Sequence, residues 1–273
     1  MRQRLTISER RACGLVGLAR TTLRRVVVEP PATAELRLRI IDLAHARRRF
    51  GYRRIHDLLR REGVHVNHKQ VYRLYREAAL SVRKRRRRKG VMIDRQALTV
   101  PTGPNEIWSI DFVMDALGNG RRIKCLTIVD DFTRECLDIA VDYGISGGYV
   151  ARVLTAVGQF RGLPRAVRTD QGPEFTSRAF LAWVTARGVR HILNQPGKPT
   201  QNAYIESFNG KFRDECLNDH YFNTLEHARA VIAAWRRDYN EARPHSAIGR
   251  IPPAEFAALH RRRSTNATEP RIV

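Results

Sequence analysis

The spacing of hydrophobic residues along the chain changes at about residue 100. Before that point, apolar residues recur every three or four positions, which is typical of helices that bury one face. Gly51 and Gly63 interrupt this pattern, and Asn67 is a suitable N-cap for a last helix over residues 68–80. Helices joined by short glycine-containing turns predict a small helix-turn-helix region. The positions expected inside it are Leu36, Ile40, Leu43, Ala44, Ile55, Leu58, Leu59, Val71, Leu74, Tyr75 and Ala78.

A second pattern begins at residue 107. Residues 107–115 alternate between apolar and polar side chains, as expected for a strand, and Gly118-Asn119-Gly120 predicts a hairpin turn after it. Further strands are expected over 122–132, 135–143, 165–170 and 189–195, and helices over 146–160, 177–188 and 202–218. Three consecutive strands followed by alternating helices and strands predict an α/β fold with a mixed five-stranded sheet and flanking helices.

The last of these helices carries polar groups beside an apolar stripe. Ile205, Phe208 and Phe212 recur at near-helical spacing, so this side is expected to pack on a core. Glu206 lies just off the stripe in the first turn. Arg213 follows seven residues later, about two turns on, and therefore projects from the same side as Glu206.

Two earlier aspartates can join Glu206. Asp111 lies inside the first strand, Asp170 ends the fourth, and 35 residues separate Asp170 from Glu206. Three carboxylates of this kind suit Mg²⁺, a hard cation that leaves positions open for substrate phosphates. The competing carboxylates are expected to be solvated at strand ends or in loops, and they are Asp115, Asp130, Asp131 and Glu174.

Charge is distributed unevenly. The chain has a formal charge of +23, and residues 1–95 hold 27 Lys and Arg against 8 Asp and Glu, a net charge of +19. Such asymmetry indicates a nucleic-acid-binding region attached to a second unit, although a solvated basic face on a small helical bundle would look the same. We expect a basic DNA-binding region over 1–95 with a basic linker at 83–89, a core over 96–260 and a polar tail over 261–273. The candidate DNA contacts in the first region are Lys69, Gln70, Arg73, Arg76, Arg85, Arg86, Arg87 and Arg88.

Several other classes of protein are disfavoured. No apolar run is long enough for a membrane span, and the basic N-terminus does not have the pattern of a signal peptide. The four cysteines are scattered, so reduced core residues are the simplest reading. No phosphate-binding GxxxxGK[ST] string occurs, so ATP is not expected as a cofactor.

Three strings carry a family resemblance: RTDQGPEF around Asp170, IESFNGKFRDECLN around Glu206, and NEARPHSAIGRIPPAEF near the end. With Asp111 they resemble the DD-35-E triad of retroviral-integrase-type transposases. More narrowly, nearly the whole chain resembles the second-frame product of IS-three-type bacterial insertion sequences. The zinc-binding module of retroviral integrases is not matched, since His65 and His68 have no cysteine pair at the required spacing.

The resemblance implies a ribonuclease-H-like fold with Asp111, Asp170 and Glu206 as catalytic metal ligands. It further implies two Mg²⁺ ions, which Mn²⁺ can replace, and DNA contacts from Arg213 and, more weakly, Lys211. His245 and its neighbours, in the last of the three strings, are expected to have a structural role.

The implied activity is DNA strand cleavage and strand transfer at insertion-sequence ends. The implied partners are double-stranded DNA of the element ends and the target, further copies of the chain on that DNA, and the product of an upstream reading frame. The implied location is the bacterial cytoplasm at the nucleoid. Two alternatives stay open: a non-catalytic DNA-binding regulator or decayed remnant, and a ribonuclease-H-type hydrolase.

Overall fold

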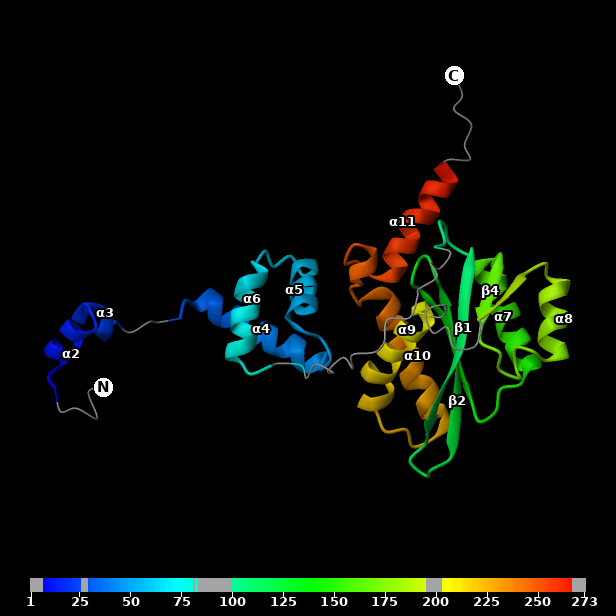
Figure 1. Ribbon diagram of the computed structural model, residues 1–273, viewed down its shortest axis with the longest axis horizontal. Helices are drawn as coiled ribbons and strands as arrows, with labels where there is room; N and C mark the ends of the chain where they lie inside the picture. Colours follow the sequence, from blue (N-terminus) through cyan, green and yellow to red (C-terminus); the bar gives the residue numbers. More distant parts are fainter. Residues whose placement is uncertain (1–6, 26–28, 81, 83–99, 195–202, 267–273) are drawn as a thin grey trace, which may run out of the picture.

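The computed structural model of the chain describes residues 7–25, 29–80, 82, 100–194 and 203–266. Its first part is helical throughout (Figure 1). The helices here are α2 (Glu9–Leu15), α3 (Arg20–Arg24), α4 (Pro31–Ala46), α5 (Tyr52–Arg61) and α6 (His68–Glu77). The Asn67 side chain accepts a hydrogen bond from the Lys69 backbone N–H at 2.9 Å, which confirms the predicted N-cap of α6.

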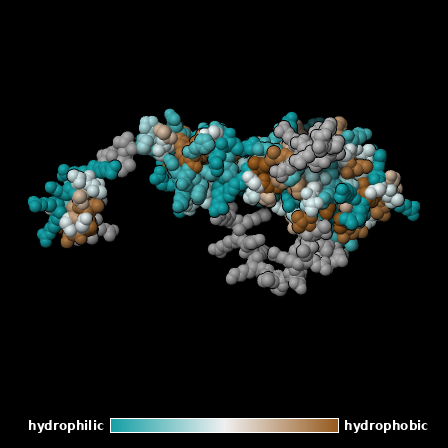
Figure 2. Space-filling model, turned by 90° about the horizontal axis from the view of Figure 1, so that it is seen from above, coloured by the Kyte–Doolittle hydropathy of each residue, from teal (hydrophilic) through white to brown (hydrophobic). Residues whose placement is uncertain are grey.

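Helices α4 to α6 share a hydrophobic core of their own. Ile40, Ile55, Leu59, Val71 and Leu74 are fully buried there, as the helical spacing predicted. Hydrophilic side chains cover most of the surface of this region, shown in teal in Figure 2. The α4–α6 region is therefore a small bundle with an apolar interior and a charged exterior, and α2 and α3 lie apart from it (Figure 1).

The second part is built on a mixed sheet. Within the described residues its five strands lie in the order β3-β2-β1-β4-β5. They are β1 (Ile107–Ala116), β2 (Arg122–Asp130), β3 (Cys136–Asp142), β4 (Ala166–Thr169) and β5 (Arg190–Leu193). β1, β2 and β3 pair antiparallel, whereas β4 and β5 add in parallel after helical connections. The turn between β1 and β2 contains Gly120 at φ 81, a backbone conformation that glycine adopts readily.

Helices cover both faces of the sheet (Figure 1). One face holds α7 (Gly147–Arg161) and α8 (Arg178–Ala186), and the other holds α9 (Ala203–Glu215) and α10 (Leu225–Glu241). A hydrophobic core lies on each face of the sheet, and the side chains of β1 alternate between the two cores. Trp108 and Ile110 point to α7 and α8, and Val113 points to α9 and α10. The Ser146 side chain accepts from the Tyr149 N–H and so caps α7, at the start of the helix predicted over residues 146–160.

Shorter elements complete the chain. Two 3-10 turns, η2 (Leu217–Asp219) and η3 (Ser246–Ile248), flank α10, and α11 (Pro253–Asn266) ends the described chain. α11 thus runs into the segment for which the sequence suggested only a polar tail. None of the described helices has both the length and the apolar character that a membrane crossing requires.

Candidate active site

Two aspartates lie side by side on adjacent strands. β1 and β4 are parallel, with Trp108 opposite Val167 and Ser109 opposite Arg168. Continuing this register by two residues brings Asp111 level with Asp170, which directly follows the last residue of β4. Asp111 is half-buried and Asp170 is exposed. Both therefore lie at the carboxyl end of β4, the edge at which open α/β sheets bind ligands.

The third carboxylate comes from α9. This helix packs on the sheet through Ile205, Phe208 and Phe212, which are almost fully buried. Glu206 lies on the side of α9 adjacent to this apolar stripe and is exposed in the first turn. The apolar stripe predicted for residues 202–218 is thus confirmed, while Asn202, at the start of the predicted helix, lies outside the described residues.

Asn209 fastens α9 to the first aspartate. Its Nδ2 donates to Oδ2 of Asp111 at 2.8 Å, and its Oδ1 accepts from the Thr127 hydroxyl at 2.9 Å. Asn209 is one turn after Glu206, so one helix supplies a carboxylate and orients another. Sequence reasoning did not find this residue. Its only signal was its spacing from Glu206, since asparagine is common in exposed helices and its partner is 98 positions away in the chain.

The pKa of Asp111 is raised first by its burial and then by its acidic neighbours. Burial raises the pKa of Asp111 to about 6, and the negative charges of Asp170 and, more weakly, Glu206 add to the rise. Hydrogen bonds from the Phe112 N–H and from Asn209 act in the opposite direction. Burial also raises the pKa of Glu206. In the described part of the chain, none of the three carboxylates forms an ion pair.

The chemistry of these side chains fits a divalent cation. Among the described residues, no three His, Cys, Asp or Glu side chains yet converge closely enough to hold an ion. Asp111, Asp170 and Glu206 nevertheless provide only oxygen donors, which Mg²⁺ prefers. A dication would also offset the like-charge repulsion that raises the pKa of Asp111. These three residues are accordingly the ones that would hold Mg²⁺.

The competing carboxylates have structural partners. Oδ2 of Asp131 is 2.5 Å from Nη1 of Arg168, and both side chains are almost fully buried. Glu174 pairs with Lys124. The side chain of Asp130 accepts from the backbone N–H groups of residues 105, 132 and 133, and that of Asp115 accepts from the N–H of residue 116. Asp130 and Asp131 are fully buried, so the solvation expected for them is wrong, whereas Asp115 makes only the contact to the next N–H that Asp111 also makes.

The candidate DNA contacts lie at three places. On α6, Lys69, Arg73 and Arg76 are exposed and Gln70 is half-buried. Arg213 donates to the Met114 carbonyl at 2.7 Å, on the same side of α9 as Asn209. Lys211 donates to the backbone and hydroxyl oxygens of Ser207 on another side of α9. The arginines of the basic linker lie outside the described residues, and they are Arg85, Arg86, Arg87 and Arg88.

The residues of the string NEARPHSAIGRIPPAEF, at positions 240–256, make structural contacts. Asn240 bonds to both backbone groups of Cys136 and so ties α10 to the edge strand β3. His245 is buried, with its ring edge against Tyr239. Burial and the neighbouring charge of Arg243 lower the pKa of His245 to about 2, so the imidazole is neutral. These contacts agree with the structural role expected for His245.

The fold and the carboxylate arrangement together define an integrase-type core of ribonuclease-H-like architecture behind a helical DNA-binding-type region. Models of the integrase core domain match residues 101–199 and 187–253, and a model of an HTH-like domain matches residues 32–89. A chain in the structure of the simian T-cell lymphotropic virus intasome in complex with PP2A regulatory subunit B56 gamma superimposes with a TM-score of 0.54 and 16% sequence identity. That match covers 76% of this chain and 69% of that chain, and it supports the fold.

Relatives at the sequence level are proteins of insertion elements. The 31.7 kDa protein of insertion element IS407 from Burkholderia multivorans is 66% identical over 96% of this chain and 94% of its own length. The transposase InsF of insertion sequence IS3A from Escherichia coli is 25% identical over 77% of each chain. The chain therefore belongs to the family of insertion-sequence transposases with an integrase core domain, which are polynucleotidyl transferases of the DDE type.

Proposed function

We propose that this chain cleaves DNA strands at the ends of an insertion sequence and joins them to target DNA in a reaction that depends on Mg²⁺. The observation that carries the proposal is the placement of Asp111 and Asp170 on adjacent parallel strands, with Asn209 of the helix that bears Glu206 bonded to Asp111. Two of the competing carboxylates are paired with basic side chains instead, Asp131 with Arg168 and Glu174 with Lys124. An acidic cluster of this kind is stable only if a cation or bound protons neutralise it.

The proposed chemistry assigns separate tasks to the side chains. Two Mg²⁺ ions, or Mn²⁺ in their place, would activate the attacking oxygen and stabilise the leaving oxygen of an in-line displacement. Asp111, Asp170 and Glu206 would hold these ions. Asn209 keeps the Asp111 carboxylate oriented through the bond to Oδ2. Water as the attacking group gives cleavage, and a DNA 3′-hydroxyl gives strand transfer.

The proposed DNA contacts divide between two regions. Residues 1–95 form the main binding region, with Lys69, Gln70, Arg73 and Arg76 on α6 and the arginines at 85–88. Residues 96–260 form the catalytic core, in which Arg213 and Lys211 would grip the DNA near its ends, and residues 261–273 form a tail. Relatives of this family support double-stranded DNA and further copies of the chain as partners. The product of an upstream reading frame remains part of the proposal.

Substitution of single carboxylates tests this function. Asp111→Asn, Asp170→Asn and Glu206→Gln should each reduce cleavage and joining of labelled terminal DNA by about 1,000-fold or more, because metal binding contributes several kcal/mol to the transition state. Duplex binding should stay nearly unchanged in all three. Asp115→Asn is the matched control, since the same change lies on the same strand, and it should stay active.

The main alternative differs in the reaction that it predicts, although it predicts the same DNA binding. A non-catalytic DNA-binding regulator would bind terminal DNA equally well in all variants and would show no metal-dependent product with the unaltered chain. Activity in Asp111→Asn together with loss in Asp115→Asn would instead mean that the first ligand is misassigned.

A further inference from the structure

Helix α5 has a charged stripe beside the apolar one. Arg54, Asp57 and Arg61 are spaced three and four residues apart, so they share one side of the helix. The apolar residues Ile55 and Leu59 face the interior of the α4–α6 region instead. The stripe carries alternating charges, basic, acidic and basic, and its side chains contact residues of the core. Helix α5 is the helix of its bundle drawn next to the core in Figure 1.

The core presents the complementary series of charges. Nη1 of Arg54 donates to Oε1 of Glu215 at 3.1 Å. Nη1 of Arg250 lies 3.1 Å from Oδ2 of Asp57. The third pair of the series joins Arg61 to Glu255 at 2.7 Å. Because the sign changes at each step, a shift of α5 by one turn would bring like charges together. The series therefore specifies one docked position.

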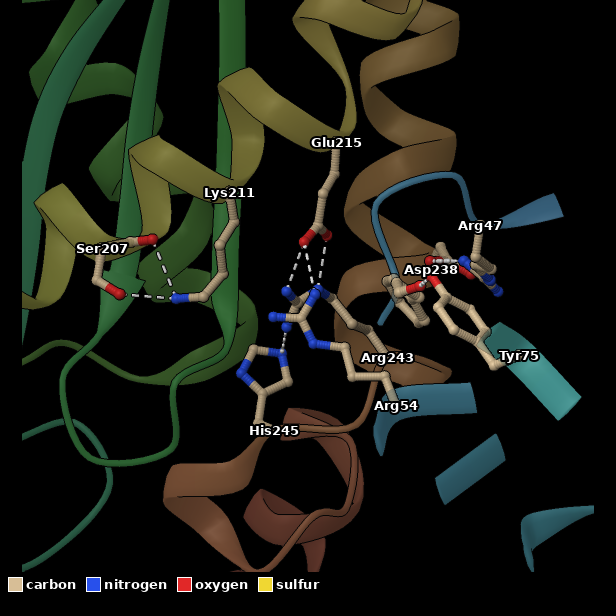
Figure 3. A network of polar contacts seen from close by, with 10 residues as sticks. Arg47, Arg54, Tyr75, Ser207, Lys211, Glu215, Asp238, Arg243 and His245 are labelled. Carbon is tan, nitrogen blue, oxygen red and sulfur yellow. Dashed lines mark hydrogen bonds and ion pairs between the residues drawn. The ribbon is translucent and has the colours of Figure 1, made fainter. Parts of the chain in front are cut away.

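The pair between Arg54 and Glu215 is the best supported of the three. Glu215 is also bound by both Nη2 and Nε of Arg243, at 2.6 and 2.7 Å, and the Arg243 side chain is 2% exposed (Figure 3). Phe50, from the loop before α5, is buried near both guanidinium groups. Its ring centre lies 5.1 Å from Cζ of Arg54 and 5.7 Å from Cζ of Arg243. One carboxylate thus joins two regions that meet over an aromatic ring.

Two geometric facts connect this interface to DNA. First, docking through α5 leaves Lys69, Arg73 and Arg76 of α6 exposed. Second, Glu215 is on the helix that carries Glu206, nine residues and about 13.5 Å further along it. A rigid interface at Glu215 therefore holds the outward side of α6 at a constant separation from the carboxylates.

We propose that the charged stripe of α5 is a docking surface that positions DNA bound by α6, and so sets which phosphodiester reaches Asp111, Asp170 and Glu206. Arg54 and Glu215 are then positioning residues for the reaction. The inference rests on the proposed strand cleavage and joining. It adds that the site of cleavage depends on contacts between the two regions.

The test compares neighbouring arginines in the full chain. Arg54→Glu reverses a charge in the docking surface. Arg53→Glu reverses the same charge one residue earlier, at an exposed side chain that lies against Tyr52 of its own helix. Hydrogen exchange followed by mass spectrometry should show faster exchange at residues 46–61 and 212–219 in Arg54→Glu only. The two variants should bind terminal DNA equally, because their net charges are equal.

Mapping of the product ends then reads the position of cleavage. The unaltered chain and Arg53→Glu should cut at one dominant phosphodiester. Arg54→Glu should spread the cuts over neighbouring positions and lower the joining rate at saturating DNA by about tenfold or more, since small misplacement of reacting groups is costly. Arg54→Lys, which retains one charged donor for Glu215, should recover most of the precision.

A charge exchange at the second pair gives an independent check. Asp57→Arg and Arg250→Asp should each loosen the interface, and the double variant should restore slow exchange and a single cut. Loosened exchange with unchanged cutting in Arg54→Glu would overturn the positioning role, and equal exchange in Arg54→Glu and Arg53→Glu would overturn the docking surface. If no variant and no unaltered chain joins DNA, the proposed function fails, while the exchange results still report on docking.

Discussion

Asp111 in strand β1 and Asp131 in the turn after strand β2 both have a raised pKa but have different neighbours. Burial raises the pKa of both Asp111 and Asp131 to about 6. Asp131 lies against the buried Arg168, whose charge acts in the opposite direction. Asp111 lies instead among other acids and an amide. The fold neutralises its structural carboxylate with a basic partner and leaves the carboxylate of the candidate site without one. The partner, more than the pKa, therefore separates the two roles.

Replacement of the aspartate by asparagine should destabilise the chain at Asp131 but should not destabilise it at Asp111. Asp131→Asn leaves the 3% exposed Arg168 charged and unpaired, and breaking a buried pair in this way should lower the free energy of unfolding by about 3–5 kcal/mol. Asp111→Asn removes a carboxylate that its neighbours disfavour, and it should leave stability unchanged or raise it. Urea unfolding at pH 7 measures both values. Equal losses would erase the contrast between the two sites.

Removal of the amide that orients Asp111 should have a smaller effect. Asn209→Ala deletes the bonds to Asp111 and Thr127, and we expect joining to fall by about 10–100-fold, as for other groups that orient metal ligands. Stability should fall by only about 1 kcal/mol, the usual net value of a hydrogen bond. Asn218→Ala, at an exposed position after α9, serves as the control in joining assays. A variant that joins DNA normally would show that Asp111 needs no such support.

The pH dependence of stability should reveal the raised pKa of Asp111 directly. In the folded chain Asp111 binds its proton up to about pH 6, against an ordinary value of 3.8. The folded state thus holds the extra proton, and the stability it contributes is present below pH 3.8 and is lost as the pH rises to about 6. The loss should be at most about 3 kcal/mol, because one pKa unit corresponds to about 1.4 kcal/mol. The difference between the unaltered chain and Asp111→Asn isolates this term, because Asp131 titrates in both. Parallel curves would contradict the raised pKa.

Much of the architecture was determined locally. The stripe Ile205, Phe208 and Phe212 and the cap Asn67 involve residues a few positions apart, and the same side chains are buried or bonded in the structure. The order of strands and helices followed from changes in hydrophobic period along the chain. The three candidate carboxylates were selected with the help of the family strings, since spacing alone does not distinguish Asp111 from Asp115 or Asp131.

Contacts between distant residues were decided only by the tertiary structure. The bond from Asn209 to Asp111 spans 98 positions, and those from Arg54 to Glu215 and from Arg61 to Glu255 span 161 and 194. A helical period shows which residues share a side of a helix, but it carries no information about what that side will meet. Packing of α9 on the sheet and of α5 on the core supplied those partners. The sequence by itself therefore determined the elements, while the folded chain decided which of the acidic residues are paired with a basic side chain and which are not.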